Sequence, residues 1–335
     1  MMINPQCRLA SRPEGLPTAA NWQYAEEPVS EPGDGEFLVE VSHISVDPAM
    51  RSWMNAGRSY VPPVEIGEVM RAGGIGRVVS SRHPDHPIGE TVYGAFGVQR
   101  YAVSDGTGVT PVDTGIAPIP AHLGVLGISG YTAYFGLFDV GRPEPGQTVV
   151  VSAAAGSVGS ITGQLAKIHG CRVIGIAGGQ EKCRILVEEL GFDAAIDYHA
   201  GNVRKELAQH APDGVDVFFD NVGGAVLEAV LARLARGARV VLSGAVSQYN
   251  TVGRPTGPAN YMQLFVARAS MTGFVVFDYA ARYGEAAGKL AGWLADGRLK
   301  SREHVIHGGV GDFPEVLAKL FRGDNVGKLI LAIDG

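Results

Sequence analysis

The 335-residue sequence predicts an α/β protein that combines a doubly wound parallel sheet with a smaller, β-rich domain. Residues 1–121 are rich in Gly and Pro and contain short, alternating strand-like segments, a texture typical of a small barrel-like domain. Residues 122–306 alternate apolar strand-like runs with helical segments, which indicates a parallel sheet covered by helices on both faces. Residues 307–335 end in another strand-like run and are expected to complete the first domain.

In the first domain, "GEFLVEVSHISV" alternates so that Phe37, Val39 and Val41 share one face of a predicted strand. The segments "IGRVVSS" and "TVYGAF" are two further strands, joined by the polar turn "RHPDHPIGE". That turn contains His83 and His86 between prolines, and we interpret it as a solvated loop rather than a metal site.

In the second domain, near-continuous apolar runs predict five strands of a parallel sheet, with helices between them. These strands are "QTVVVSA", "RVIGIA", "DAAIDY", "VDVFFDNVGG" and "ARVVLSGA".

Composition narrows the class of protein. The formal net charge is −6, and no run of Lys and Arg is present that would follow a nucleic-acid backbone. No apolar stretch approaches the ~18 residues of a membrane-spanning helix. The first residues do not resemble a signal peptide. Cys7, Cys171 and Cys183 are scattered, which fits a reducing compartment. We therefore expect a cytoplasmic protein that binds a small molecule, and neither nucleic acid nor a membrane.

A glycine-rich turn follows the first strand of the second domain. It reads Ala154-x-Gly156-x-x-Gly159, a dinucleotide-binding pattern in which Ala replaces the first glycine. Gly156 would let the backbone approach a pyrophosphate, and Gly159 would let the following helix lie close to the strands. The amino end of that helix would present free N–H groups to the phosphates. The alternative interpretation is a tight strand-to-helix turn without a ligand.

The end of the second strand indicates which dinucleotide is bound. NAD-binding proteins place Asp or Glu there to bond the ribose 2′-hydroxyl, whereas this strand ends in Gly178-Gly179. Lys182 and Arg184 follow, and such cations suit a 2′-phosphate. The pattern predicts NADP(H), and the alternative is a solvated helix start.

No metal site is predicted. A catalytic zinc needs Cys, His and acidic ligands, but no histidine adjoins Gly67-Glu68 and no cysteine lies between Cys7 and Cys171.

Without a metal, hydride addition to an already polarised double bond is easier than oxidation of an alcohol. It requires hydrogen-bond donors that stabilise the developing enolate.

Motifs along nearly the whole chain resemble those of a known family. They are "SVDPAMRSWM", "GEVMRAGGIGRVV", "AAAGSVGSITGQLAKIHGCRVIGIAGGQEK", "FFDNVGG", "SGAVSQYN" and "GDNVGK". In this order they are similar to the zinc-free branch of the medium-chain dehydrogenase/reductase superfamily, which contains prostaglandin reductases, plant double-bond reductases and curcumin-reductase-like enzymes. The resemblance implies a GroES-like catalytic domain, a Rossmann domain and a homodimer. It also implies NADPH-dependent reduction of the carbon–carbon double bond of α,β-unsaturated ketones and aldehydes.

The resemblance also implies which residues contact NADP(H). The expected contacts are Gly156, Ser157, Val158 and Gly159 at the pyrophosphate; Gly178, Lys182 and Tyr198 around the 2′-phosphate; Asn221 along the ribose; Ser243, Gly244, Ala245, Val246, Ser247, Tyr249, Phe274, Val275 and Val276 beside the nicotinamide half; and Asn325 from the terminal segment.

Two tyrosines are the candidates for catalysis. Tyr249 in "SQYN" is expected to donate a hydrogen bond to the substrate oxygen or to bind the nicotinamide ribose. The alternative interpretation is that Tyr249 is simply an aromatic residue packed in the loop. Tyr60 is a second donor or a wall of the cleft, and otherwise a surface aromatic. We expect Arg51 to brace the first domain, and Tyr261 and Phe265, at helical spacing, to belong to the core.

Two rival functions remain open. A quinone reductase of the same superfamily would share every cofactor residue. A non-catalytic NADPH-binding protein would need neither Tyr249 nor an open cleft.

Overall fold

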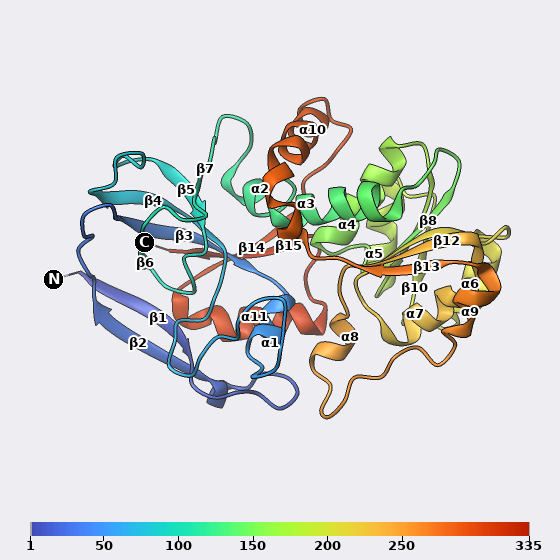
Figure 1. Cartoon of the computed structure of the whole chain (residues 1–335), viewed down its shortest axis with the longest axis horizontal. Helices are drawn as coiled ribbons and strands as arrows, with labels where there is room; N and C mark the ends of the chain where they lie inside the picture. The colour runs from blue at the N-terminus through green and yellow to red at the C-terminus, as the bar shows by residue number, and fades with distance from the viewer. Residues whose placement is uncertain (1, 335) are drawn as a thin grey trace. The chain divides into compact units, whose positions relative to one another are not determined.

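A computed structural model describes residues 2–334 of the chain (Figure 1). They form two compact units, one of residues 2–123 with 303–334 and one of Gly124–Arg302. The chain enters the second unit after residue 123, where the sequence suggested 121, and leaves it at 302, where the sequence suggested 306. We describe each unit by itself.

The second unit contains a six-stranded sheet in which every pairing is parallel. The strand order is β10-β9-β8-β11-β12-β13, so the chain returns to the middle of the sheet after β10 and then continues outward on the other side of β8. This is the doubly wound order that the sequence predicts. The strands are β8 (Thr148–Ser152), β9 (Arg172–Ala177), β10 (Ala194–Asp197), β11 (Val215–Asp220), β12 (Leu234–Leu242) and β13 (Ser270–Gly273).

Helices cover both faces of this sheet, as the apolar strands require. Figure 1 shows α4 and α7 on opposite faces. Val150, Phe218 and Val240 belong to the buried core between strands and helices. The helices are α3 (Ile128–Phe135), η2 (Gly136–Gly141), α4 (Ser157–Ile168), α5 (Gln180–Arg184), η3 (Ile185–Glu189), α6 (Val203–His210), α7 (Gly224–Leu231), α8 (Val246–Tyr249), α9 (Met262–Ala267), η4 (Val276–Arg282) and α10 (Tyr283–Ala295).

The first unit is β-rich. A seven-stranded sheet has the order β14-β15-β3-β4-β5-β7, with β6 also paired to β3, and β1 and β2 form a separate antiparallel pair. The strands are β1 (Ile3–Leu9), β2 (Trp22–Pro28), β3 (Phe37–Val46), β4 (Gly74–Ser81), β5 (Thr91–Gly94), β6 (Tyr101–Ser104), β7 (Thr110–Pro111), β14 (Glu303–Gly308) and β15 (Lys328–Ile333). The helices are η1 (Ala19–Asn21), α1 (Ala49–Trp53), α2 (Ile119–Leu123), η5 (Val310–Asp312) and α11 (Phe313–Arg322).

The alternation predicted in β3 is confirmed, since Phe37, Val39 and Val41 are all completely buried in the core of this unit. Arg51 braces the unit as expected. Its buried guanidinium donates to the carbonyl oxygens of Gly15 and Pro13 at 2.8 and 3.0 Å.

The interpretation of the histidine turn as solvated is wrong for His86. This side chain is only 8% exposed, its ring packs against that of Phe37 with the centroids 4.5 Å apart, and its Nδ1 lies 2.8 Å from a carboxylate oxygen of Glu90. The polar sequence of the turn did not indicate this burial, because the ring that covers His86 belongs to Phe37 on β3, which is distant in the chain.

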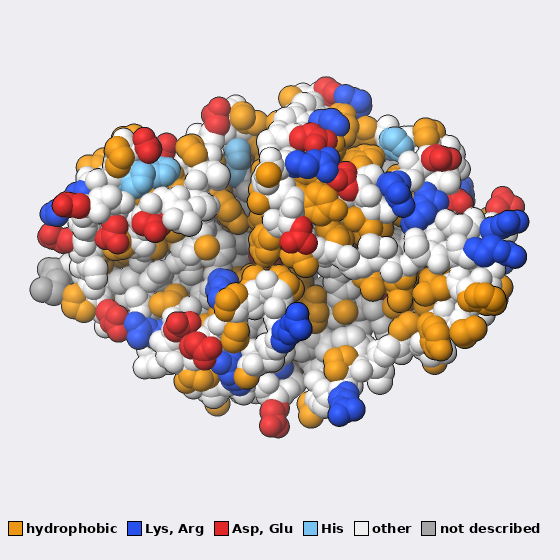
Figure 2. Space-filling model, viewed as in Figure 1, with side chains coloured by type: hydrophobic (Ala, Val, Ile, Leu, Met, Phe, Trp, Pro, Cys, Tyr) orange, Lys and Arg blue, Asp and Glu red, His pale blue; other side chains and the backbone are white. Residues whose placement is uncertain are grey.

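The expectation that Tyr261 and Phe265 belong to the core is also wrong. They are 59% and 76% exposed at the start of and within α9, where Met262 and Val266 are exposed as well. Figure 2 shows hydrophobic side chains gathered on the surface over α9 and α7. Helical spacing identified an apolar face but not whether anything covers it.

Within residues 2–334, every helix is too short or too polar to cross a lipid bilayer.

Candidate functional site

The carboxyl ends of the six parallel strands lie along one edge of the sheet, and a candidate cofactor residue follows each of them. Parallel strands end at the same edge, and ligands of doubly wound sheets bind there. The segments are 156–159 after β8, 178–182 after β9, Tyr198 after β10, Asn221 after β11, 243–249 after β12 and 274–276 after β13. The topology therefore brings residues from six separate parts of the sequence to one edge.

The turn after β8 needs its glycines for steric reasons. A Cβ atom on Gly159 would lie 2.4 Å from the carbonyl oxygen of Ala153, so a side chain there would force the helix away from the strand. Ala153 itself has a φ of 46°, an unusual conformation for a residue with a side chain. Gly156 is the N-cap of α4 and provides no side-chain cap to the helix. The turn is thus compact and leaves the helix amino terminus bare.

The side chain of Ser157 is further evidence that an anion binds at this position. Its hydroxyl oxygen is buried and has no hydrogen-bond partner among the described residues. Buried polar atoms without partners are rare in folded proteins and call for a ligand, ion or water. The first N–H groups of the 12-residue helix α4 also lack partners within the helix. Hydroxyl and N–H groups together fit the pyrophosphate of a dinucleotide.

The end of β9 places Gly178 against Tyr198. A Cβ on Gly178 would lie 2.9 Å from the hydroxyl oxygen of Tyr198, so a larger residue here would require the tyrosine side chain to move. Lys182 lies in α5, directly after these glycines. The nearby carboxylate of Asp197 accepts from the Gly179 N–H at 2.8 Å, and this bond lowers the pKa of Asp197.

The second cation of α5 is already engaged in ion pairs. The guanidinium of Arg184 donates to Glu181 at 2.6 Å and to Glu188 at 2.9 Å. These bonds lower the pKa of Glu181. The acid next to Lys182 therefore pairs with Arg184, whose guanidinium is shared between two carboxylates.

A buried polar network joins the ends of β8 and β11, and sequence reasoning missed two of its members. The hydroxyl of Ser152 donates to Asp220 at 2.7 Å and accepts from the N–H of Asn221 at 2.8 Å. The Asn221 amide also donates to the Ser152 carbonyl at 2.8 Å. Burial raises the pKa of Asp220, against the lowering effect of the bonds from Ser152, Val222 and Gly223. The sequence did contain a signal for these two residues, since each is a polar residue at the end of an otherwise apolar strand.

The loop after β12 positions Tyr249. Its hydroxyl oxygen accepts from the N–H of Ala245 at 3.3 Å and lies 3.2 Å from where a Cβ of Gly244 would be. The hydroxyl of Ser247 donates to the Val222 carbonyl at 2.6 Å, which fastens this loop to the end of β11. Val246 lies in the same short helix, α8, and Ser243 donates its N–H to the carbonyl of Asp220.

Phe274, Val275 and Val276 follow the edge strand β13. Phe274 is half-buried, with its ring 6.4 Å from that of Phe219. Val276 is buried and begins η4. These residues form the apolar end of the row.

The remaining candidates, Tyr60 and Asn325, belong to the first unit. Tyr60 is 51% exposed, and its hydroxyl oxygen accepts from the indole N–H of Trp53 at 3.2 Å. Partial burial raises the pKa of Tyr60, so the phenol is protonated at neutral pH. Asn325 is buried, and its amide donates to the Gly327 carbonyl at 2.9 Å.

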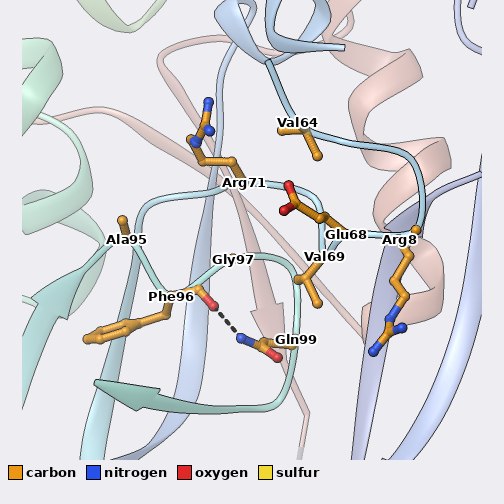
Figure 3. A pocket seen from close by; sticks show the side chains of 10 residues that line it. Arg8, Val64, Glu68, Val69, Arg71, Ala95, Phe96, Gly97 and Gln99 are labelled. Atoms are coloured by element: carbon orange, nitrogen blue, oxygen red, sulfur yellow. Dashed lines mark hydrogen bonds between the residues drawn. The ribbon is translucent and has the colours of Figure 1, made fainter. Parts of the chain in front are cut away.

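The first unit also contains a cavity of about 430 Å³. Figure 3 shows Glu68, Val69 and Phe96 around it and the guanidinium of Arg71 directed away from Gly97. The amide of Gln99 donates to the Phe96 carbonyl at 2.8 Å on its far side.

No group of three or more His, Cys, Asp or Glu side chains within residues 2–334 has an arrangement that could hold a metal ion.

Two family descriptions match the sequence. Residues 5–112 match "N-terminal domain of oxidoreductase", and residues 157–291 match "Zinc-binding dehydrogenase".

Individual relatives cover almost the whole chain. An NADPH-dependent curcumin reductase from Escherichia coli is 40% identical over 98% of this chain and 96% of its own length. An NADP(+)-dependent 2-alkenal reductase from Nicotiana tabacum is 35% identical over 90% and 88%. The crystal structure of CurA from Vibrio vulnificus in complex with NADPH superposes with a TM-score of 0.93, at 42% identity and 99% coverage of both chains. The protein described here belongs to the zinc-independent branch of the medium-chain dehydrogenase/reductase superfamily.

Proposed function

We propose that this protein is an NADPH-dependent reductase of the carbon–carbon double bond in α,β-unsaturated ketones and aldehydes. The observation that carries the proposal is the row of residues at the carboxyl edge of the sheet, combined with relatives whose names state NADPH-dependent reduction of curcumin and NADP-dependent reduction of 2-alkenals.

The cofactor is NADPH, held along this edge. The buried hydroxyl of Ser157 and the N–H groups of Val158 and Gly159 bind the pyrophosphate. Lys182 binds the 2′-phosphate in a space that Gly178 keeps open beside Tyr198. Asn221 is oriented toward the ribose by its two bonds to Ser152.

When bound, the reduced nicotinamide supplies a hydride for the β-carbon of the substrate. The chain's own task is to stabilise negative charge on the substrate carbonyl oxygen. Phenols do this well because they are protonated at neutral pH and donate a hydrogen bond. Tyr249 and Tyr60 are the proposed donors, and Phe274, Val275 and Val276 exclude water beside the ring.

A substrate panel tests the proposal. Purified protein with a chelator present is assayed for NADPH oxidation with enones, enals, quinones and saturated ketones, and products are identified by mass spectrometry. We expect turnover of enones and enals, with one deuterium of NADPH labelled at both C4 positions appearing at the β-carbon of a saturated product. Turnover of quinones alone, or an alcohol product from an enone, would overturn it. Tight NADPH binding without turnover of any compound would instead support a non-catalytic binding protein.

We further propose that the protein is a homodimer that pairs through the second unit. β13 is the edge strand of the parallel sheet, and the helix that precedes it, α9, exposes Met262, Phe265 and Val266, with Tyr261 exposed at its start. An open strand edge next to an exposed apolar patch favours association. Sedimentation is expected to show a dimer, and Phe265→Asp a monomer. A monomeric unmodified protein would contradict this.

We also propose that the protein works in the cytoplasm. Cys7, Cys171 and Cys183 are free thiols, and burial raises the pKa of Cys7 to about 12. Free cysteines are typical of a reducing compartment. Fractionation of the producing cells tests this, and recovery of the protein outside the cytoplasm would contradict it.

A further inference from the structure

The turns that follow the neighbouring strands β9 and β10 are fastened to one carboxylate. Asp197, the last residue of β10, accepts a hydrogen bond from the N–H of Gly179 at 2.8 Å and another from the N–H of His199 at 2.9 Å, both at Oδ1. The bond from Gly179 and, after it, the bond from His199 lower the pKa of Asp197, so this acceptor is ionised at neutral pH. The two turns are therefore held side by side at the carboxyl edge of the sheet.

The rings of Tyr198 and His199 both lie against Gly178. A Cβ atom on Gly178 would be 2.9 Å from Cε1 of His199 and 2.9 Å from the hydroxyl oxygen of Tyr198. The two rings meet edge to face, with their centroids 4.3 Å apart. Proteins that bind NAD carry an acid at the end of this strand for the ribose 2′-hydroxyl. In this chain an imidazole and a phenol lie beside that position instead.

The imidazole of His199 is suited to bind an anion there. Its Cε1 lies between the two ring nitrogens, so the edge that reaches Gly178 has a nitrogen on each side. The side chain is exposed, and within residues 2–334 neither ring nitrogen makes a hydrogen bond. Neutral imidazole has one N–H donor and the protonated form has two, so His199 can donate in either state. Phosphate oxygens are strong acceptors for such donors.

We propose that His199 is a further specificity-determining residue, which donates a hydrogen bond to the 2′-phosphate of NADPH and so adds to the discrimination against NADH. The inference rests on the cofactor part of the proposed function, in which Lys182 and Tyr198 lie around this phosphate. Every residue on which it depends belongs to the second unit. The glycine-rich pattern and the missing acid did not indicate His199, because it follows a different strand.

Titration calorimetry on the purified full chain tests this with four probes. NADPH and NADH are the intact cofactors, and 2′,5′-ADP and 5′-AMP represent the adenosine half with and without the 2′-phosphate. His199→Phe keeps a ring beside Tyr198 but removes both nitrogens. It is expected to weaken the binding of NADPH and 2′,5′-ADP about three- to tenfold, the usual worth of one hydrogen bond. The affinities for NADH and 5′-AMP are expected to stay unchanged.

Three further variants separate recognition of the phosphate from support of the turn. His199→Arg restores a donor and is expected to keep the preference for NADPH over NADH. His210→Phe is the matched control, because His210 lies in the last turn of α6, before β11 begins, and is expected to bind all four probes normally. His199→Ala removes the ring as well as the nitrogens. If His199→Ala weakens NADPH binding while His199→Phe does not, the imidazole only packs against Tyr198 and the inference is wrong.

The remaining outcomes distinguish this inference from the proposed function. Equal losses of NADPH and NADH affinity in His199→Phe would overturn the inference, since the residue would then support the turn for either cofactor. If Lys182→Ala loses NADPH affinity and His199→Phe does not, only the role of His199 is wrong. If the substrate panel shows no turnover but His199→Phe selectively weakens NADPH and 2′,5′-ADP, the inference holds and enone reduction is wrong.

Discussion

The hydroxyl of Ser152 donates a 2.7 Å hydrogen bond to the carboxylate of Asp220, and both residues are completely buried. They lie at the ends of β8 and β11, the neighbouring strands between which the winding of the sheet reverses. Asp220 also accepts from the N–H groups of Val222 and Gly223 at 3.0 to 3.1 Å. One carboxylate therefore shapes the turn that presents Asn221.

We predict that Asp220→Ala lowers the free energy of unfolding by about 3 kcal/mol or more, because several buried donors lose their acceptor at about 1–3 kcal/mol each. Urea denaturation measures this. Asp213→Ala is the matched control: Asp213 is exposed in the loop before the same strand, and its loss is expected to change stability by less than about 0.5 kcal/mol. Equal stabilities of the two variants would show that the network contributes little.

Gly159→Ala is expected to weaken the binding of NADPH and NADH to a similar extent. The new Cβ would lie 2.4 Å from the Ala153 carbonyl oxygen, so the helix must move away from the turn. Overpacking of this kind costs about 1–3 kcal/mol of stability. Gly288→Ala, at an open and exposed position of α10, is the control and is expected to raise Tm, since Ala is favoured over Gly in helices. Thermal melts and cofactor titrations check both, and unimpaired binding by Gly159→Ala would refute the steric argument.

Lys182→Ala is expected to weaken NADPH binding by about 10- to 100-fold, the worth of a hydrogen bond to a charged group. NADH lacks the 2′-phosphate, so its affinity is expected to stay nearly unchanged. Arg184→Ala serves as the control and is expected to have little effect on either cofactor, because that guanidinium is paired with Glu181 and Glu188. Calorimetric titration measures the four affinities, and equal losses for NADPH and NADH in Lys182→Ala would disprove a 2′-phosphate contact.

Tyr249→Phe is expected to lower turnover of an enone by about 10²- to 10³-fold, the usual cost of losing a donor to a developing oxyanion. NADPH affinity is expected to remain nearly intact, because the aromatic ring stays in the loop. Tyr24→Phe, which loses only an exposed bond to Glu26, is the control. Steady-state kinetics with saturating NADPH distinguish the two, and unchanged turnover in Tyr249→Phe would remove this residue from the mechanism.

Asp193 is expected to make stability depend on acid pH. Burial opposes its ionisation, but the bonds from Lys167 at 2.8 Å and from the Val173 N–H at 2.7 Å outweigh it and lower the pKa of Asp193. A carboxylate with a lowered folded pKa stabilises the protein above its unfolded pKa of about 3.9, and this stability is lost as pH falls through the folded pKa. Asp193→Asn is therefore expected to be less stable than the unmodified protein at pH 7. The difference is expected to shrink below about pH 4 in denaturation experiments. A difference that does not vary with pH would contradict this.

Much of the second unit could be predicted because local patterns determine it. Apolar runs such as "VDVFFD" identified the parallel strands, and the spacing of Gly156 and Gly159 identified the compact turn between β8 and α4, where we propose that phosphates bind. Partners distant in the chain could not be predicted. The sequence did not show that His86 packs against Phe37, nor that Glu181 pairs with Arg184 instead of opposing Lys182.

The sequence by itself determined the doubly wound fold, the family and the preference for NADP(H), because these depend on short-range spacing and on which residue types follow each strand. Only the tertiary structure decided that Ser152 and Asp220 support Asn221, that Trp53 donates a hydrogen bond to Tyr60, and that Tyr261 and Phe265 face outward. The physical reason is that burial and hydrogen bonding depend on what lies opposite a residue in space, and strand order brings together residues that are far apart in the chain.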